Sequence, residues 1–197
     1  LLQIELNFPD HHRLPNWKTV SAAQKIQVVH SSIHEMILIG RLDHIVLSRA
    51  KQYQISKIHV LEVSYEEMIN HTIYLSIINL LKELNPDLIL FSDSKLDLEL
   101  ASRCSIDLEY PIYTQLEDIF VERDGISCSR NIFAGKGKQT FRFTNSNLIF
   151  SLHTKSFSEP EVKGNGQEPI ISYIEPSFSP VLRRILSIER FFDLIPI

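Results

Sequence analysis

The sequence NPDLILFSDSK, residues 85–95, indicates the fold of this chain. An Asn-Pro pair ends a helical pattern, and the apolar segment 88–91 then has the composition of a buried strand. The strand stops at three polar residues, Ser92, Asp93 and Ser94, before another helical pattern begins. An open α/β sheet places its ligand crevice where a strand ends in a polar loop before a helix. We therefore predict a nucleotide-type pocket at Ser92, Asp93 and Ser94.

Upstream of this stretch, expected strands alternate with expected helices. Ser64 is followed by Glu67 three residues later, the spacing of a helix capping box. Strands separated by helices of this length imply right-handed crossovers and a parallel sheet. The expected elements are strands at 2–6, 35–39, 57–63 and 88–91, and helices at 19–29, 43–53, 64–84 and 96–104.

Downstream of Pro111 the pattern changes to short strands with turn residues between them. We expect an α/β domain over residues 1–157, and a linker with a C-terminal strand and helix over residues 158–197. The expected strands are 112–121, 126–133, 140–143, 148–152 and 170–174, the linker is 158–168, and the last helix is 180–194.

Composition excludes several classes of protein. The net charge of −4, with acidic and basic residues interleaved, is not typical of a nucleic-acid binder. No apolar run is long enough to span a bilayer, and the N-terminal residues lack the pattern of a signal peptide. Cys104 and Cys128 are expected to be free thiols in a cytoplasmic protein.

Three segments resemble the N-terminal domain of the electron transfer flavoprotein alpha subunit, in the same order along the chain. NPDLILF at 85–91 resembles the strand that leads into the polar loop of that family. RNIFAG at 130–135 is similar to its Arg-Pro-Ile-Tyr-Ala-Gly turn, and LHTKSF at 152–157 is similar to its Val-Arg-Pro-x-Ser-Phe strand end. The resemblance covers roughly residues 33–157.

The resemblance implies a three-layer α/β fold with a parallel sheet of the adenine nucleotide alpha hydrolase-like type and added antiparallel strands. In that family FAD lies mainly in the C-terminal domain of the alpha subunit, against the beta subunit, and a related beta-subunit domain binds AMP. The sequence shows no counterpart of that FAD domain, so we expect a stand-alone relative that lacks it. His153 stands where the family usually has Arg, and Gln115 stands near a common Asp.

Seven residues are candidates for contact with a cofactor, and all of them except Arg130 also have a purely structural interpretation. Ser and Asp residues at 92–94 are good helix N-caps, Gly40 could form a turn beside a solvated Arg41, and the Gly-Lys-Gly-Lys segment 135–138 is either an anion-binding nest or a hairpin turn. His30 and His34 are four residues apart but straddle an expected boundary between a helix and a strand, and the sequence has no Gly-x-Ser-x-Gly elbow. We therefore expect neither a metal site nor a catalytic triad. The candidates are Gly40, Arg41, Ser92, Asp93, Ser94, Arg130 and Gly135.

Three functions remain open at this point. The first is an electron transfer flavoprotein alpha-related protein, without catalytic activity of its own, that helps to position a flavin or nucleotide held mostly by a partner. The second is a binding module for AMP or a related nucleotide, and the third is a cofactor-free interaction protein. FAD or AMP is not expected to be held by this chain alone. The expected partner is a beta-subunit-like chain, or a second copy that docks through the apolar segment 180–194.

Overall fold

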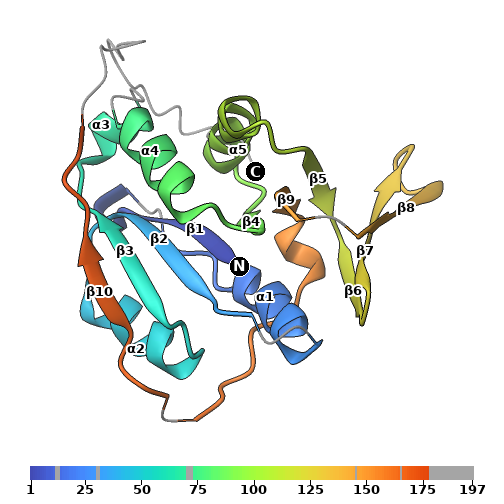
Figure 1. The fold of residues 1–197 in the computed structure, drawn as a ribbon, viewed down its shortest axis with the longest axis horizontal. Coiled ribbons are helices and arrows are strands. Elements are labelled where there is room, and N and C mark those ends of the chain that lie inside the picture. Colours follow the sequence, from blue (N-terminus) through green and yellow to red (C-terminus); the bar gives the residue numbers. More distant parts are fainter. Residues whose placement is uncertain (12–13, 30–31, 70–72, 145, 165, 178–197) are drawn as a thin grey trace, which may run out of the picture.

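A computed structural model describes residues 1–11, 14–29, 32–69, 73–144, 146–164 and 166–177. Its centre is a seven-stranded, all-parallel sheet with helices on both faces, and a separate three-stranded antiparallel sheet lies beside it (Figure 1). The predicted three-layer α/β fold with added antiparallel strands is therefore confirmed. In spatial order the parallel strands are β10 (Ile170–Tyr173), β3 (Lys57–Leu61), β2 (Glu35–Gly40), β1 (Leu2–Asn7), β4 (Leu88–Phe91), β9 (Leu148–Leu152) and β5 (Ile112–Leu116).

Apolar side chains on the two faces of the sheet form separate cores with the covering layers. On one face lie α3 (Tyr65–Ile69), α4 (Tyr74–Leu84) and α5 (Lys95–Leu108), and on the other lie α1 (Lys18–Val29) and α2 (His44–Gln52). The antiparallel strands β6 (Asp118–Glu122), β7 (Gly125–Ile132) and β8 (Gly137–Phe143) share a core with α1. Short 3₁₀ turns, η1 (Pro9–His11) and η2 (Thr154–Ser156), follow β1 and β9.

The segment 64–84 forms two helices rather than the one that was predicted. Its start is as expected, because the Ser64 N–H donates to Glu67 Oε2 at 2.7 Å and the Glu67 N–H donates to Ser64 Oγ at 3.2 Å. The second helix, α4, begins after Ile73, whose backbone is not helical (φ −94°, ψ 1°). Met68 of α3 and Ile73, just before α4, are both buried in the same core, so the two helices pack on the same face of the sheet.

The segment 112–121 is also divided, into β5 of the parallel sheet and β6 of the antiparallel sheet. Gln115 has a φ of 58°, and the pairing register of β5 with β9 shifts between Tyr113 and Leu116. The Glu117 N–H then donates to the Ser129 carbonyl at 2.8 Å, which starts the antiparallel pairing. A left-handed residue at the end of β5 thus turns the chain out of one sheet and into the other.

Residues 158–164 and 166–169, which we call the strap, cross α1 and α2 and lead into β10. The Glu161 N–H donates to Gln24 Oε1 at 2.9 Å, Gln24 Nε2 donates to the Glu161 carbonyl at 2.8 Å, and the Lys163 N–H donates to the Gln52 carbonyl at 3.1 Å. The expected strand at 170–174 is confirmed as β10, which pairs in parallel with β3. The helix expected at 180–194 lies outside the described residues. Among the described residues, no helix has the length and apolar character that a membrane span requires.

Candidate functional site

The order of strands places a topological switch point between β1 and β4. The chain moves from β1 to β2 and β3 on one side of the sheet, and then returns to β4 on the other side of β1 (Figure 1). Ligands of open α/β sheets bind beyond the carboxyl ends of the strands at such a point. Asn7, Gly40 and Ser92 lie at or just after the carboxyl ends of β1, β2 and β4 in this region, and His153 directly follows β9.

Ser92 and Ser94 are held by the first turn of α5. Both hydroxyl groups donate to Asp97 Oδ2, that of Ser94 at 2.5 Å, and the Asp97 N–H donates back to Ser94 Oγ at 3.2 Å. Ser94 is therefore the N-cap of α5, which was the structural alternative for this residue. The strand, loop and helix that the sequence predicted here are present. The serine side chains of the loop form hydrogen bonds with the first turn of the helix that follows.

Asp93 connects the end of β4 to the segment that follows β9. Its Oδ2 lies 3.0 Å from His153 Nδ1, and its Oδ1 accepts a hydrogen bond of 2.8 Å from Thr154 Oγ1. Each carboxylate oxygen thus already has one partner within the protein, so a ribose hydroxyl would have to share Asp93 with His153 and Thr154. His153, which departs from the pattern of the resembling family, takes a defined role as a partner of Asp93.

Gly40 and Arg41 lie on the opposite side of β1 from Ser92. Gly40 has a φ of 113°, and a Cβ atom at this position would lie 2.3 Å from the carbonyl oxygen of Asn7. Asn7 Nδ2 donates to the Arg41 carbonyl at 2.6 Å and to Asp43 Oδ2 at 3.1 Å. Glycine is required here because the ends of β1 and β2 approach each other so closely.

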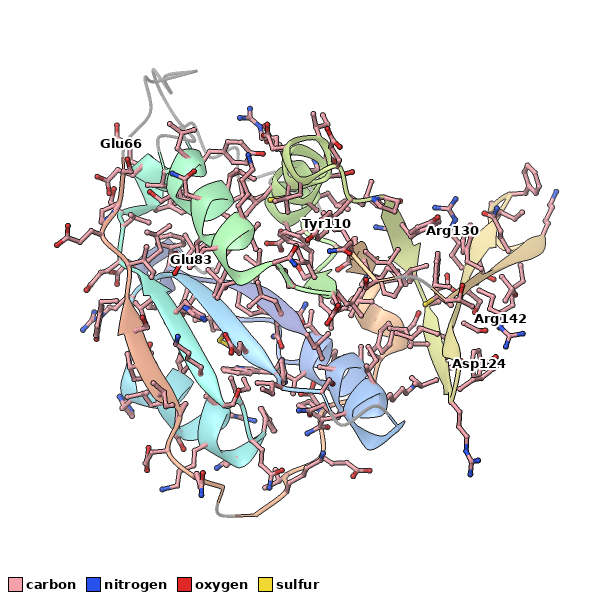
Figure 2. The ribbon with its side chains drawn as sticks, viewed as in Figure 1. Glu66, Glu83, Tyr110, Asp124, Arg130 and Arg142 are labelled. Carbon is pink, nitrogen blue, oxygen red and sulfur yellow. The ribbon has the colours of Figure 1, made fainter. Side chains whose placement is uncertain are left out.

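Arg130 and Gly135 lie in the antiparallel sheet rather than at the switch point. Arg130 Nη1 donates to the Thr114 carbonyl of β5 at 3.2 Å, and its guanidinium group lies 5.2 Å from the ring centre of Phe141. Figure 2 shows Arg130 on the side of the molecule that also carries Asp124 and Arg142. Gly135 is exposed in the turn between β7 and β8. The structure thus brings Gly40, Arg41 and residues 92–94 to one edge of the sheet, but not Arg130 and Gly135.

A buried polar network next to this edge was not predicted from the sequence. Glu5 of β1 accepts hydrogen bonds from Thr19 Oγ1 at 2.5 Å, Gln3 Nε2 at 2.6 Å and the Asn16 N–H at 2.6 Å. The Oε1 atom of Gln3 lies 3.0 Å from His34 Nε2. The only signal in the sequence is the alternation of polar residues with Leu2, Ile4 and Leu6 along β1.

Burial, together with the negative charge of nearby Asp97, raises the pKa of Glu5 to about 8. Hydrogen bonds from Thr19, Asn16 and Gln3 act in the opposite direction and are outweighed. Burial lowers the pKa of His34 to about 3. At neutral pH, Glu5 is therefore largely protonated and His34 is neutral, so this network carries little charge.

The residues at the switch point fit a nucleotide phosphate poorly. The two serine hydroxyls that could donate to a phosphate already donate to Asp97, and a bound phosphate would also lie close to the carboxylates of Asp93 and Asp97. None of the seven candidate residues lines any of five cavities formed by described residues. Within the same residues, no group of three or more His, Cys, Asp or Glu side chains could hold a metal ion.

The fold and its switch point define an open, doubly wound α/β domain. The family model described as the electron transfer flavoprotein domain matches residues 15–176, which is most of the chain. The chain therefore belongs to the electron transfer flavoprotein domain family, as its three short segments suggested. A comparison with curated proteins gave no significant match.

Proposed function

We propose that this protein is related to the electron transfer flavoprotein alpha subunit and supports electron transfer by helping to position a flavin or nucleotide held mostly by a partner. The observation that carries the proposal is the family match over residues 15–176. This range contains every strand of the parallel sheet except β1. In such a role the cofactor supplies the redox chemistry, and the protein supplies position and surroundings.

The contacts at the switch point support a positioning role over independent cofactor binding. Asp93, Ser92 and Ser94 are engaged with His153, Thr154 and Asp97, so internal hydrogen bonds hold these side chains before any ligand arrives. A partner chain that carries the cofactor would meet a preformed surface, which lowers the entropic cost of association. The natural partner for this role is a beta-subunit-like chain.

A second candidate function is direct binding of AMP or a related nucleotide. Ser92–Ser94 directly precede α5, and backbone N–H groups at a helix N-terminus attract anions. Asp93→Ala should alter nucleotide affinity if this function is correct, because the variant removes a carboxylate from the site. An unchanged calorimetric isotherm with AMP would exclude Asp93 from nucleotide binding.

The first experiment is an absorption spectrum of the purified protein, followed by heat release and identification of any nucleotide. Flavin retained at less than one equivalent per chain supports the proposed function. Adenine nucleotide without flavin favours direct nucleotide binding instead. A protein that releases neither, forms a stable oligomer with itself and gains no flavin when mixed with a beta-subunit-like chain would overturn both in favour of an interaction role.

A further inference from the structure

A cavity of about 510 Å³ lies where β5 begins and β8 ends. The rings of Tyr113, Phe141 and Phe143 line it, together with Pro111 and Leu148. Its volume falls within the range of small-molecule pockets in proteins. Tyr113 and Leu148 lie near the amino ends of their strands, so this cavity is at the opposite edge of the sheet from Ser92–Ser94.

The three rings form one cluster that is only half-buried. Tyr113 contacts Phe143 with ring centres 4.5 Å apart and Phe141 with ring centres 5.0 Å apart, both edge to face. Phe141 and Phe143 are nearly parallel, with an angle of 19° between their planes. Because aromatic surface left facing a cavity is costly to hydrate, a planar ring that covers it would gain both apolar burial and aromatic contact.

The charges around the cavity favour an uncharged ligand. Arg142 Nη2 lies 3.0 Å from Glu122 Oε2 and 3.0 Å from Asp124 Oδ2, so two carboxylates already balance its charge. Glu109 adds another carboxylate to the lining, whereas Ser146 adds a hydroxyl group. A phosphate or carboxylate group would meet an excess of negative charge here, while a neutral polar edge would find hydrogen-bonding partners.

We propose that this cavity binds an uncharged, planar heteroaromatic ring system, such as that of a nucleoside or of riboflavin, against the cluster of Tyr113, Phe141 and Phe143. The site is separate from the switch point and does not use Ser92–Ser94. Shape and aromatic contact select the ring. Phosphorylated forms are disfavoured by the Glu109 carboxylate, because Arg142 is already paired with Glu122 and Asp124.

The test is a titration of riboflavin with the purified chain, in which the quenching of flavin fluorescence measures binding. We expect saturable quenching, and we expect Tyr113→Leu to weaken binding by about tenfold or more. Ser146→Trp is a second variant, because it fills the cavity from an exposed position without removing a ring of the cluster. Phe120→Ala is the matched control, since Phe120 is an exposed ring of β6 that does not line this cavity.

Competition experiments separate the two ligand sources and test the role of charge. Displacement of riboflavin by adenosine assigns nucleosides to the site, and failure of adenosine to compete assigns it to the flavin ring system. AMP should compete more weakly than adenosine. Absence of saturable quenching, equal affinity in Ser146→Trp and the native protein, or AMP that competes better than adenosine would overturn the proposal.

Discussion

Glu5 places a titratable group in the middle of the parallel sheet, and its pKa of about 8 in the folded protein is far above the ordinary glutamate value of 4.5. A carboxyl group whose pKa is raised by folding stabilises the protein fully below its unfolded pKa, and this contribution is lost as the pH rises through the folded pKa. Above pH 6.5, the ordinary pKa of a histidine side chain, His34 is mainly neutral whether the chain is folded or unfolded, so it contributes little to the slope. We therefore expect the free energy of unfolding to fall between about pH 6.5 and pH 8 because of Glu5, by at most about 1.4 kcal/mol per pH unit.

The measurement is urea denaturation at a series of pH values in this window. Glu5→Gln, which stays neutral, should have a flatter dependence of unfolding free energy on pH than the native protein. Glu62→Gln is the control, because the Glu62 side chain is exposed and its removal should leave the slope unchanged. Equal slopes for Glu5→Gln and the native protein would show that Glu5 does not titrate in this range.

At the scale of single residues, the sequence predicted the caps better than the buried polar groups. Ser64, Glu67 and Ser94 act at helix starts as local sequence rules require, because a cap depends only on its own turn. Glu5 could not be identified, because alternation along β1 is also the pattern of a strand with one face in water. Only the central place of β1 in the sheet buries both faces.

At the scale of elements, the turn between β7 and β8 has an unfavourable sequence for its backbone. Phe133 and Ala134 both have a φ of 52°, a conformation that glycine and asparagine adopt far more readily. The Phe133 side chain is 79% exposed, so it contributes little packing in return. We expect Phe133→Asn combined with Ala134→Gly to stabilise the protein by roughly 1 kcal/mol, which would raise the melting temperature by about 2–4 °C.

Calorimetry on the double variant would measure this gain. Phe120→Asn is the control, because Phe120 is an exposed ring of the same sheet in ordinary strand backbone, and its loss should lower stability. A melting temperature for the double variant at or below that of the native protein would mean that the Phe133 ring makes stabilising contacts after all.

The element boundaries that the sequence missed have non-local causes. The division of segment 112–121 depends on Gln115, whose left-handed backbone is fixed by the junction of two sheets rather than by its own propensity. Gly135 and Asn147, by contrast, were correctly placed between strands, since turn residues act locally. The cluster around Asp93 was predicted as a polar loop, but its partners His153 and Thr154 come from a strand end about sixty residues later.

At the scale of the whole molecule, the strap joins α1 and α2 to the edge of the sheet. Gln24 makes two hydrogen bonds to the backbone of Glu161, and these hold the chain on its way to β10. We expect Gln24→Ala to speed hydrogen exchange of the β10 amides while the exchange of β1 stays unchanged, because β10 is an edge strand that can open locally. Exchange followed by mass spectrometry is the measurement, and Gln167→Ala, an exposed amide in the same strap, is the control.

Faster exchange throughout the sheet in Gln24→Ala would contradict this expectation, since it would mean that the strap and the core unfold together.

The sequence predicted the class of this fold from the alternation of strands and helices. It could not predict the strand order, because the position of β9 between β4 and β5 is a property of the whole sheet.

That position of β9 also sets an order of events during synthesis on the ribosome. The four strands β3, β2, β1 and β4 are complete once residue 91 has been made, but the neighbour of β4 in the finished sheet ends at residue 152. For the whole of that interval the apolar strand Leu88–Phe91 has an open edge, which is a template for pairing with other nascent chains. We therefore expect rapid translation, or a chaperone that covers this edge, to reduce aggregation of the newly made chain until β9 pairs with β4.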